Sequence, residues 1–255
     1  MSAVQSLPQS QPLPAAVPSV RPVGLTVLTF ITGLGVVFGL YLALFVAGTD
    51  TTQGDVQRIF YIHMPAFFGA FTAFSVTVVG GIQYLRTRNP KWDTLALAGV
   101  EVGIGLALVN LVTGSIWARP IWNTWWNWDP RLVSDAIMAL TYAAYLMLRN
   151  AIENPETRFR FAAVYGIVAI VTAIATLMIT RVTPTTIHPV VVGPSPVNAQ
   201  GTFEATKGVA GALVPNIFIW GAFVPATLIW YRVRLQNFSD RVQAMKFALI
   251  SKQES

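Results

Sequence analysis

The chain has 255 residues, of which 54% are hydrophobic and only 11% are charged, and its formal net charge is +6. Soluble domains carry about 25% charged residues, so this composition excludes an ordinary soluble domain. The sequence contains no cysteine, which excludes disulfides, thiolate metal ligands and thioether attachment of a cofactor. It also has no glycine-rich phosphate-binding loop, so any ATP hydrolysis would need another subunit.

In chain order, residues 1–22 come first and predict a flexible tail, because they are rich in Pro, Gln and Ser and have no acidic or aromatic residue. Six sparsely charged apolar runs follow, each long enough to cross a hydrocarbon core about 30 Å thick. They predict membrane-spanning helices at about residues 24–47, 62–85, 94–117, 132–149, 160–181 and 209–232. We therefore predict an all-α fold, a polytopic membrane protein with a six-transmembrane-helix bundle over residues 23–235 and a C-terminal tail over 236–255.

The distribution of Lys and Arg predicts the orientation of this bundle. The N-terminal tail, the second and fourth loops and the C-terminal segment hold twelve basic residues, whereas the first, third and fifth loops hold five. Cytoplasmic segments retain positive charge, so we expect both termini in the cytoplasm and the three poorer loops outside an inner (cytoplasmic) membrane. The topology accounts for the positive net charge, so this charge does not indicate nucleic-acid binding. We therefore expect the lipid bilayer as a partner and no nucleic acid.

Two histidines are the only ones in the chain, and the predicted topology places both on the outer side. His63 lies in RIFYIHMPAFF at the outer start of the second helix, and His188 lies in TPTTIHPVVV before the sixth. Neutral imidazole is a common metal ligand and a standard axial ligand of haem iron. The alternative is that each histidine forms hydrogen bonds at the membrane boundary. Both interpretations stay open at this point.

The third loop, within GSIWARPIWNTWWNWDPRL, concentrates tryptophan. Five of the eight tryptophans of the chain lie there, at Trp117, Trp122, Trp125, Trp126 and Trp128. Membrane interfaces enrich tryptophan, but a belt of that kind places only one or two at a helix end. If this stretch were a short interfacial helix, four positions would share one face and form a flat aromatic surface, namely Trp122, Trp125, Trp126 and Asp129.

A large planar porphyrin could stack on such a surface, with a basic side chain at its rim. Arg119 and Arg131 are candidates for pairing with the propionate groups. Arg131 has an alternative partner in Asp135, which is four residues further along the fourth helix. The sequence favours neither alternative.

Two further features lie inside the predicted spans, an ionisable side chain and pairs of glycines. Glu101 lies within the third helix, where an ionisable group must be paired, protonated or facing a polar cavity. We expect a protonated carboxyl group bonded to a neighbouring helix, and the alternative is a proton or partner site. Gly35 with Gly39, and Gly99 with Gly103, have the GxxxG spacing that permits close helix approach.

With these residues in view, the chain resembles the CcmC haem-handling (haem exporter) family of cytochrome c maturation systems. RIFYIHMPA, LVTGSIWARPIWNTWWNWDPRL and SDAIMALTYAAYLML carry the resemblance, and the second stretch has the tryptophan-rich WWD signature of a wider haem-handling superfamily. The resemblance implies that His63 and His188 are the axial ligands of haem iron, and that the tryptophan-rich segment with Asp129 is the haem surface. The chain departs from the family where Asn123 replaces the usual glycine and in the residues flanking His188.

The resemblance implies a role without catalysis. Haem b would be held non-covalently and passed on the periplasmic side to a CcmE-like haem chaperone. CcmA/CcmB-like ABC transporter subunits would then help to release the loaded chaperone, and a small CcmD-like membrane peptide would be a further partner. Two other functions are compatible with the sequence: a b-type haem subunit for electron transfer, and a transporter of another small solute. The first would bury paired ligands within the bundle, and the second would show broken helices with related halves.

Overall fold

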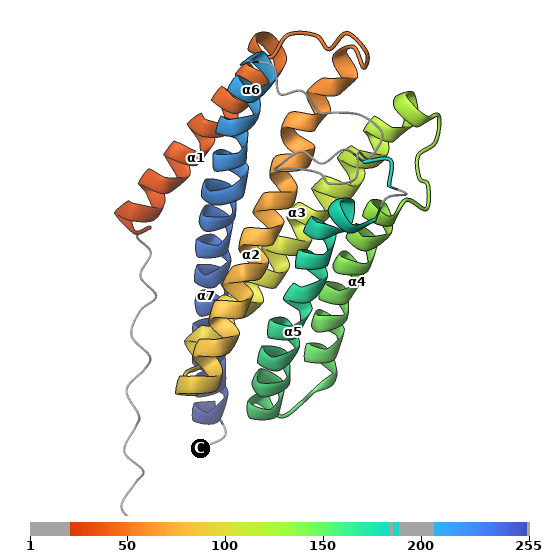
Figure 1. The fold of residues 1–255 in the computed structure, drawn as a ribbon. Coiled ribbons are helices and arrows are strands. Elements are labelled where there is room, and N and C mark those ends of the chain that lie inside the picture. The colour runs from red at the N-terminus through yellow and green to blue at the C-terminus, as the bar shows by residue number, and fades with distance from the viewer. Residues whose placement is uncertain (1–20, 184–185, 189–206, 254–255) are drawn as a thin grey trace, which may run out of the picture.

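The computed structural model describes residues 21–183, 186–188 and 207–253, and these residues form a helical bundle (Figure 1). Residues 1–20, most of the predicted N-terminal tail, lie outside the described residues. The elements are α1 (Val23–Tyr41), the π-helical η1 (Leu42–Val46), the 3₁₀-helical η2 (Asp55–Ile59), α2 (Phe60–Thr87), α3 (Pro90–Trp122), α4 (Pro130–Ala151), α5 (Pro155–Val182), α6 (Lys207–Phe218), the π-helical η3 (Ile219–Phe223) and α7 (Val224–Gln253).

The predicted fold class is confirmed. Within the described ranges, six helical segments are long and apolar enough to cross a membrane. Most are longer than their predicted spans, because hydropathy marks the apolar centre of a helix and misses its polar ends. The largest differences are at α3, which continues to Trp122, and at the sixth span, which continues through η3 and α7 beyond residue 232 to Gln253.

Three helices begin at the same local signal, an Asn or Asp followed by Pro. Asn89, Asp129 and Asn154 precede α3, α4 and α5, and the side chain of each accepts a backbone N–H of the first turn at 2.8 to 3.1 Å. The side-chain oxygen satisfies an N–H that the helix cannot, and proline suits the position that follows because it has no N–H to lose. These caps define where the helices start, and Asp129 thereby begins α4 directly after the third loop.

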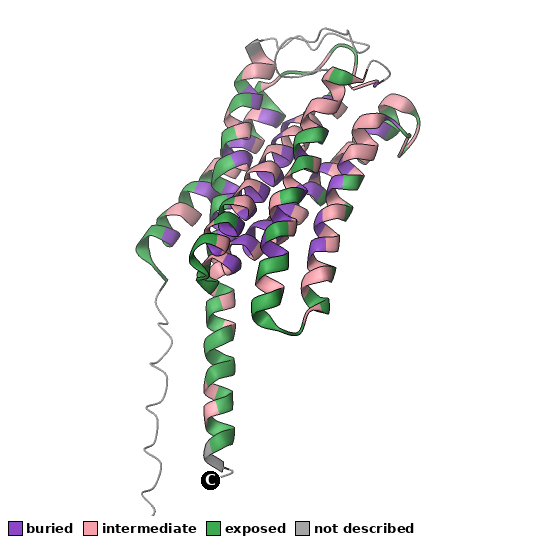
Figure 2. Ribbon diagram, turned by 60° about the horizontal axis from the view of Figure 1, so that its bottom comes forward, coloured by how far each residue is buried: buried purple, intermediate pink, exposed green. Residues whose placement is uncertain are grey.

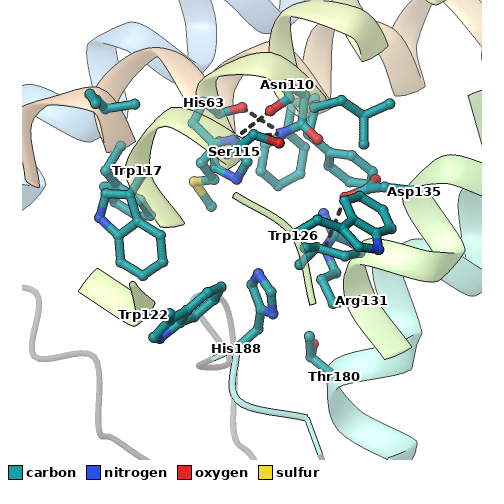
Figure 3. A pocket seen from close by; sticks show the side chains of 18 of the residues that line it. His63, Asn110, Ser115, Trp117, Trp122, Trp126, Arg131, Asp135, Thr180 and His188 are labelled. Atoms are coloured by element: carbon teal, nitrogen blue, oxygen red, sulfur yellow. Dashed lines mark hydrogen bonds and ion pairs between the residues drawn. The ribbon is translucent and has the colours of Figure 1, made fainter. Parts of the chain in front are cut away.

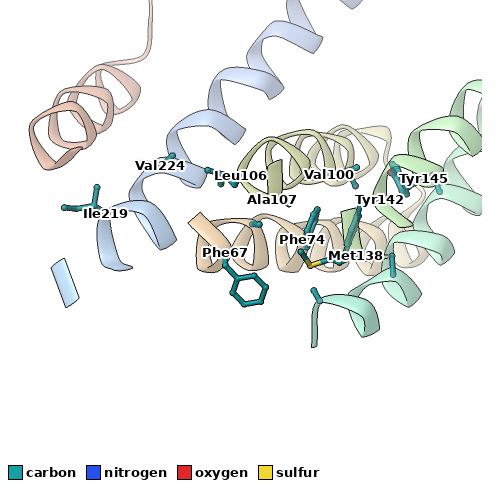
Figure 4. Close-up of a cluster of buried hydrophobic side chains, with 14 residues drawn as sticks. Phe67, Phe74, Val100, Leu106, Ala107, Met138, Tyr142, Tyr145, Ile219 and Val224 are labelled. Carbon is teal, nitrogen blue, oxygen red and sulfur yellow. The ribbon is translucent and has the colours of Figure 1, made fainter. Parts of the chain in front are cut away.

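The largest core cluster lies among α2, α3, α4 and α5 (Figure 4). At its centre the rings of Phe74 and Tyr142 stack with centroids 3.5 Å apart, and both side chains are fully buried. α1 is different, because apolar side chains such as Phe30 and Val37 are 67% and 66% exposed (Figure 2). An apolar exposed face of this kind suits contact with lipid.

Small residues let the helices approach closely, as the GxxxG spacing predicts. A methyl group on Gly99 would meet Thr77 and the backbone of Ala73 on α2, and one on Gly103 would meet the ring of Phe74. On α1, a methyl group on Gly39 would meet the side chain of Asn216, which itself donates a hydrogen bond to the Gly39 carbonyl at 3.0 Å. The close packing of α2 against α3 also positions side chains of the site described below.

Glu101 is paired with a neighbouring helix, but its partner is a cation. The Nη2 of Arg232 on α7 donates to Glu101 Oε1 at 2.9 Å, and the two side chains form an ion pair. The expectation of a bond to a neighbouring helix is therefore confirmed, and the group that makes it is a guanidinium.

We expect Gly103→Ala to lower the free energy of unfolding by about 1 to 3 kcal/mol, because Phe74 is held by its stack on Tyr142 and cannot yield to an added methyl group. Gly105→Ala is the matched control, since nothing lies within 4 Å of its Cβ position and alanine favours the helix. Unfolding in mixed detergent micelles measures both. Equal stability of the two variants would contradict tight packing of α2 on α3.

Candidate haem site

A pocket opens at one end of the bundle, between residues of the first and third loops and His188 (Figure 3). The space free of atoms, including open solvent at its mouth, is about 1300 Å³. Its walls come from α2, α3, α4, α5, η2 and the segment around residue 188. Residues from distant parts of the chain therefore share one cavity.

The pocket gathers six of the ten residues singled out in the sequence: His63, His188, Trp117, Trp122, Trp126 and Arg131. The other four, Trp125, Trp128, Arg119 and Asp129, do not line it. The two imidazoles face each other across the cavity (Figure 3). The two histidines thus meet in one site, as bis-histidine coordination would require.

His63 is held by a reciprocal pair of bonds with α3. Its Nδ1 lies 2.9 Å from the backbone oxygen of Asn110, and the Asn110 side-chain amide donates to the His63 backbone oxygen at 2.8 Å. Since a carbonyl oxygen only accepts, the Nδ1 carries the proton and Nε2 is left as the electron-pair donor. The ring fits against α3 because position 114 is glycine, where a Cβ would lie 2.9 Å from the imidazole.

His188 is held by the carboxylate of Asp129. Its Nδ1 lies 2.9 Å from Asp129 Oδ1, and Asp129 is almost fully buried although it does not line the pocket. Burial disfavours the charged carboxylate, but hydrogen bonds from His188 and from the backbone N–H groups of Ile187 and Arg131 outweigh it and lower the pKa of Asp129 to about 2. At neutral pH the group beside His188 is therefore an anion.

The tryptophans do not form the flat surface that a short interfacial helix would give, and that expectation is wrong. α3 continues to Trp122 and ends because Asn123 adopts a left-handed conformation with φ of 55°, after which residues 123–129 are irregular. Asparagine tolerates this conformation better than most residues, so it suits the position that ends α3. Trp125 and Trp128 consequently point away, with 59% and 83% of their surface exposed.

The tryptophans that do line the pocket form walls at angles to each other. Trp117 and Trp122 pack edge to face with centroids 4.8 Å apart, and Trp122 meets the His188 ring in the same way at 5.1 Å. The Nε1 of Trp117 donates to the Gln53 side chain at 3.0 Å, which ties this wall to the first loop. The result is an aromatic enclosure that contacts one of the two histidines directly.

The two candidate arginines differ in position. Arg119 is exposed and bonds to the side chain of Asn123, outside the pocket lining. Arg131 lines the pocket, with its guanidinium carbon 4.4 Å from the centre of the Phe67 ring and its Nε 3.6 Å from Asp135. The pair with Asp135 is thus formed, and the guanidinium also donates to the backbone oxygen of Thr176. Arg131 and Arg181 are the two basic side chains among the lining residues.

Sequence reasoning missed several polar lining residues. Gln53, Gln57 and Arg181 line the pocket, as does Asn110, whose Oδ1 is buried without a hydrogen-bond partner. Asn110 could have been found, because a lone amide within an apolar span is costly unless it bonds to another helix or to a ligand. The glutamines carry no comparable signal, since they lie at a polar helix start.

Comparison with known proteins identifies relatives. The family model described as heme exporter protein C matches residues 14–183. The chain is 35% identical over 143 residues to heme exporter protein C of Paracoccus denitrificans, covering 56% of this chain and 57% of the relative. It is 31% identical over 129 residues to heme exporter protein C of Escherichia coli, covering 49% and 51%.

A putative cytochrome c biosynthesis ccmC-like mitochondrial protein of Arabidopsis thaliana is 35% identical over 111 residues, covering 44% of this chain and 43% of the relative. The chain therefore spans about half the length of the curated relatives it matches. The family model covers more than half of the chain, including α1 to α5 and most of the pocket. On this evidence, the chain belongs to the heme exporter protein C family.

Proposed function

We propose that this protein holds haem b non-covalently in the pocket between His63 and His188 and passes it to a periplasmic haem chaperone during the biogenesis of c-type cytochromes. The observation that carries the proposal is the pair of imidazoles that face each other across one aromatic pocket. Two neutral imidazoles are a suitable axial pair for haem iron. The names of the relatives, which concern heme export and cytochrome c biosynthesis, support the same conclusion.

The pocket suits a porphyrin in three further respects. Trp117, Trp122 and Trp126 offer apolar rings to the macrocycle, and Arg131 offers a cation to a propionate. No cysteine is present to attach the vinyl groups, so haem would stay exchangeable. The chain would thus act as a carrier and need not break or form a covalent bond.

We place the pocket on the outer face of the inner membrane with both termini in the cytoplasm. Figure 1 supports this arrangement, because α7 finishes at the end of the bundle opposite the pocket and α1 also starts away from the pocket end. A CcmE-like chaperone could then reach the pocket from the periplasm. CcmA/CcmB-like ABC transporter subunits would supply the ATP hydrolysis, and a small CcmD-like membrane peptide completes the proposed complex.

The histidine pair leads to a spectroscopic prediction. We expect the protein purified in detergent with haem to give a low-spin spectrum, because two imidazoles form a strong axial field, and His63→Ala or His188→Ala to lose it. External imidazole should restore the low-spin spectrum, since it refills a vacant coordination site but cannot repair a collapsed bundle. If both variants keep the wild-type spectrum before imidazole is added, bis-histidine ligation is wrong.

The difference between neighbouring tryptophans leads to a second prediction. Trp126→Ala should weaken haem retention about three- to tenfold, because ring packing contributes about 1 kcal/mol beyond the area it buries. Trp125→Ala should have little effect, since Trp125 does not line the pocket. Haem loss to apomyoglobin measures the difference. Equal losses in the two variants would show that the pocket wall is not what retains haem.

Reporter fusions test the orientation separately. Fusions after Arg88, Arg158 and Ser255 should report the cytoplasm, and fusions after Trp126 and Gln200 should report the periplasm, because twelve of seventeen basic residues lie on the first side. A cytoplasmic signal from the Trp126 fusion would overturn the proposed direction of transfer while leaving haem binding itself in place.

A further inference from the structure

Asp129 connects the start of α4 to the segment that carries His188. Its Oδ1 accepts from the backbone N–H of Arg131 at 2.8 Å, from the hydroxyl of Thr186 at 3.1 Å and from His188 Nδ1 at 2.9 Å. Its Oδ2 accepts from the backbone N–H of Ile187 at 2.8 Å. Only the first of these four bonds is needed to cap a helix, and the other three all hold residues 186–188.

We propose that Asp129 is a positioning residue that holds His188 by Nδ1, presents its Nε2 to the iron, and makes His188 the stronger donor of the two axial imidazoles. The inference rests on the proposed haem-binding function. It assigns Asp129 a place behind the ligand, whereas the sequence had suggested direct contact with haem.

The two histidines differ in the group behind them. His63 Nδ1 donates to a neutral backbone carbonyl of Asn110, whereas His188 Nδ1 donates to a carboxylate. A charged acceptor draws the Nδ1 proton more strongly and leaves more electron density on the opposite nitrogen, which raises the basicity of the ligand. A more basic imidazole stabilises ferric over ferrous iron.

The two histidines also differ in how they are held. His63 lies within α2, where helix packing and the Asn110 bonds determine its position. His188 lies outside every helix, and its described contacts are with Asp129, Thr186 and the ring of Trp122. Of these, Asp129 alone bonds the imidazole to a helix. Loss of this carboxylate should therefore release His188 while His63 stays in place.

Nitrogen NMR of protein labelled with ¹⁵N-histidine tests this arrangement without haem, because the chain has only two histidines. At about pH 8, where an unperturbed histidine is neutral, wild-type His188 should carry its proton on Nδ1. The His188 signals, assigned with His188→Ala, should change in Asp129→Asn while those of His63 stay unchanged. Asp55→Asn, in the first loop, is the control for loss of one carboxylate and should affect neither. A wild-type His188 protonated on Nε2 would overturn the proposal.

Asp129→Asn is the informative variant with haem bound, because asparagine caps a helix as well as aspartate and so preserves the start of α4. We expect haem retention to fall about 10- to 100-fold, as for other residues behind a metal ligand, and the midpoint potential to rise. Asp129→Ala should lose the low-spin spectrum, and external imidazole should restore it.

The outcomes separate the two proposals. A wild-type protein that binds no haem would contradict the proposed function. A wild-type protein that binds haem, together with an Asp129→Asn variant of unchanged potential and retention, would contradict the role of Asp129 alone. Lower thermal stability of Asp129→Asn without haem, combined with an unchanged potential, would reduce Asp129 to a structural cap.

Discussion

The close packing of α2 against α3 is the interaction on which the site depends. Glycines on α3 bring the two helices together at Phe74 and Thr77, and the same interface continues outward to His63 and Asn110. Because the His63 ring lies against Gly114 and bonds to the Asn110 backbone, a change in the separation of the helices would move the imidazole directly. The rigidity of this wall comes from backbone contact, which few side-chain adjustments can replace.

The segment that carries His188, on the opposite side of the pocket, is held by hydrogen bonds and not by helix packing. Residues 186–188 belong to no helix, and each of them donates a hydrogen bond to Asp129. Asp129 is itself held in position because it precedes Pro130 and caps the start of α4. His63 is therefore held by helix packing, whereas the segment that carries His188 is held by hydrogen bonds to one buried carboxylate.

The bilayer explains why the site lies at the end of the bundle. A charged group inside the hydrocarbon core is costly unless it is paired, and two carboxylates of α3, Asp93 and Glu101, pair with Arg149 and Arg232. Near the loops, water is accessible and imidazoles, amides and guanidinium groups can line an open cavity at lower cost.

The sequence by itself determined the helical class, the six spans and their order, because hydropathy over twenty residues depends on local composition and on nothing distant. It also pointed to the histidines and tryptophans as unusual groups, since their types and crowding are visible without a fold. It erred in the third loop, where helical spacing suggested one aromatic face. The left-handed conformation of Asn123 ends α3 at Trp122, and in the irregular segment that follows Trp126 lines the pocket whereas Trp125 and Trp128 are exposed.

Only the tertiary structure decided which residues meet. Asp129 and His188 are 59 residues apart in the chain, and His63 and Asn110 are 47 apart, so no local pattern could pair them. The same holds for Arg131, whose local partner Asp135 was predictable from helical spacing but whose place beside Phe67 was not. Periodicity predicts which side chains share a face of one helix, whereas the packing of several helices determines which faces enclose a cavity.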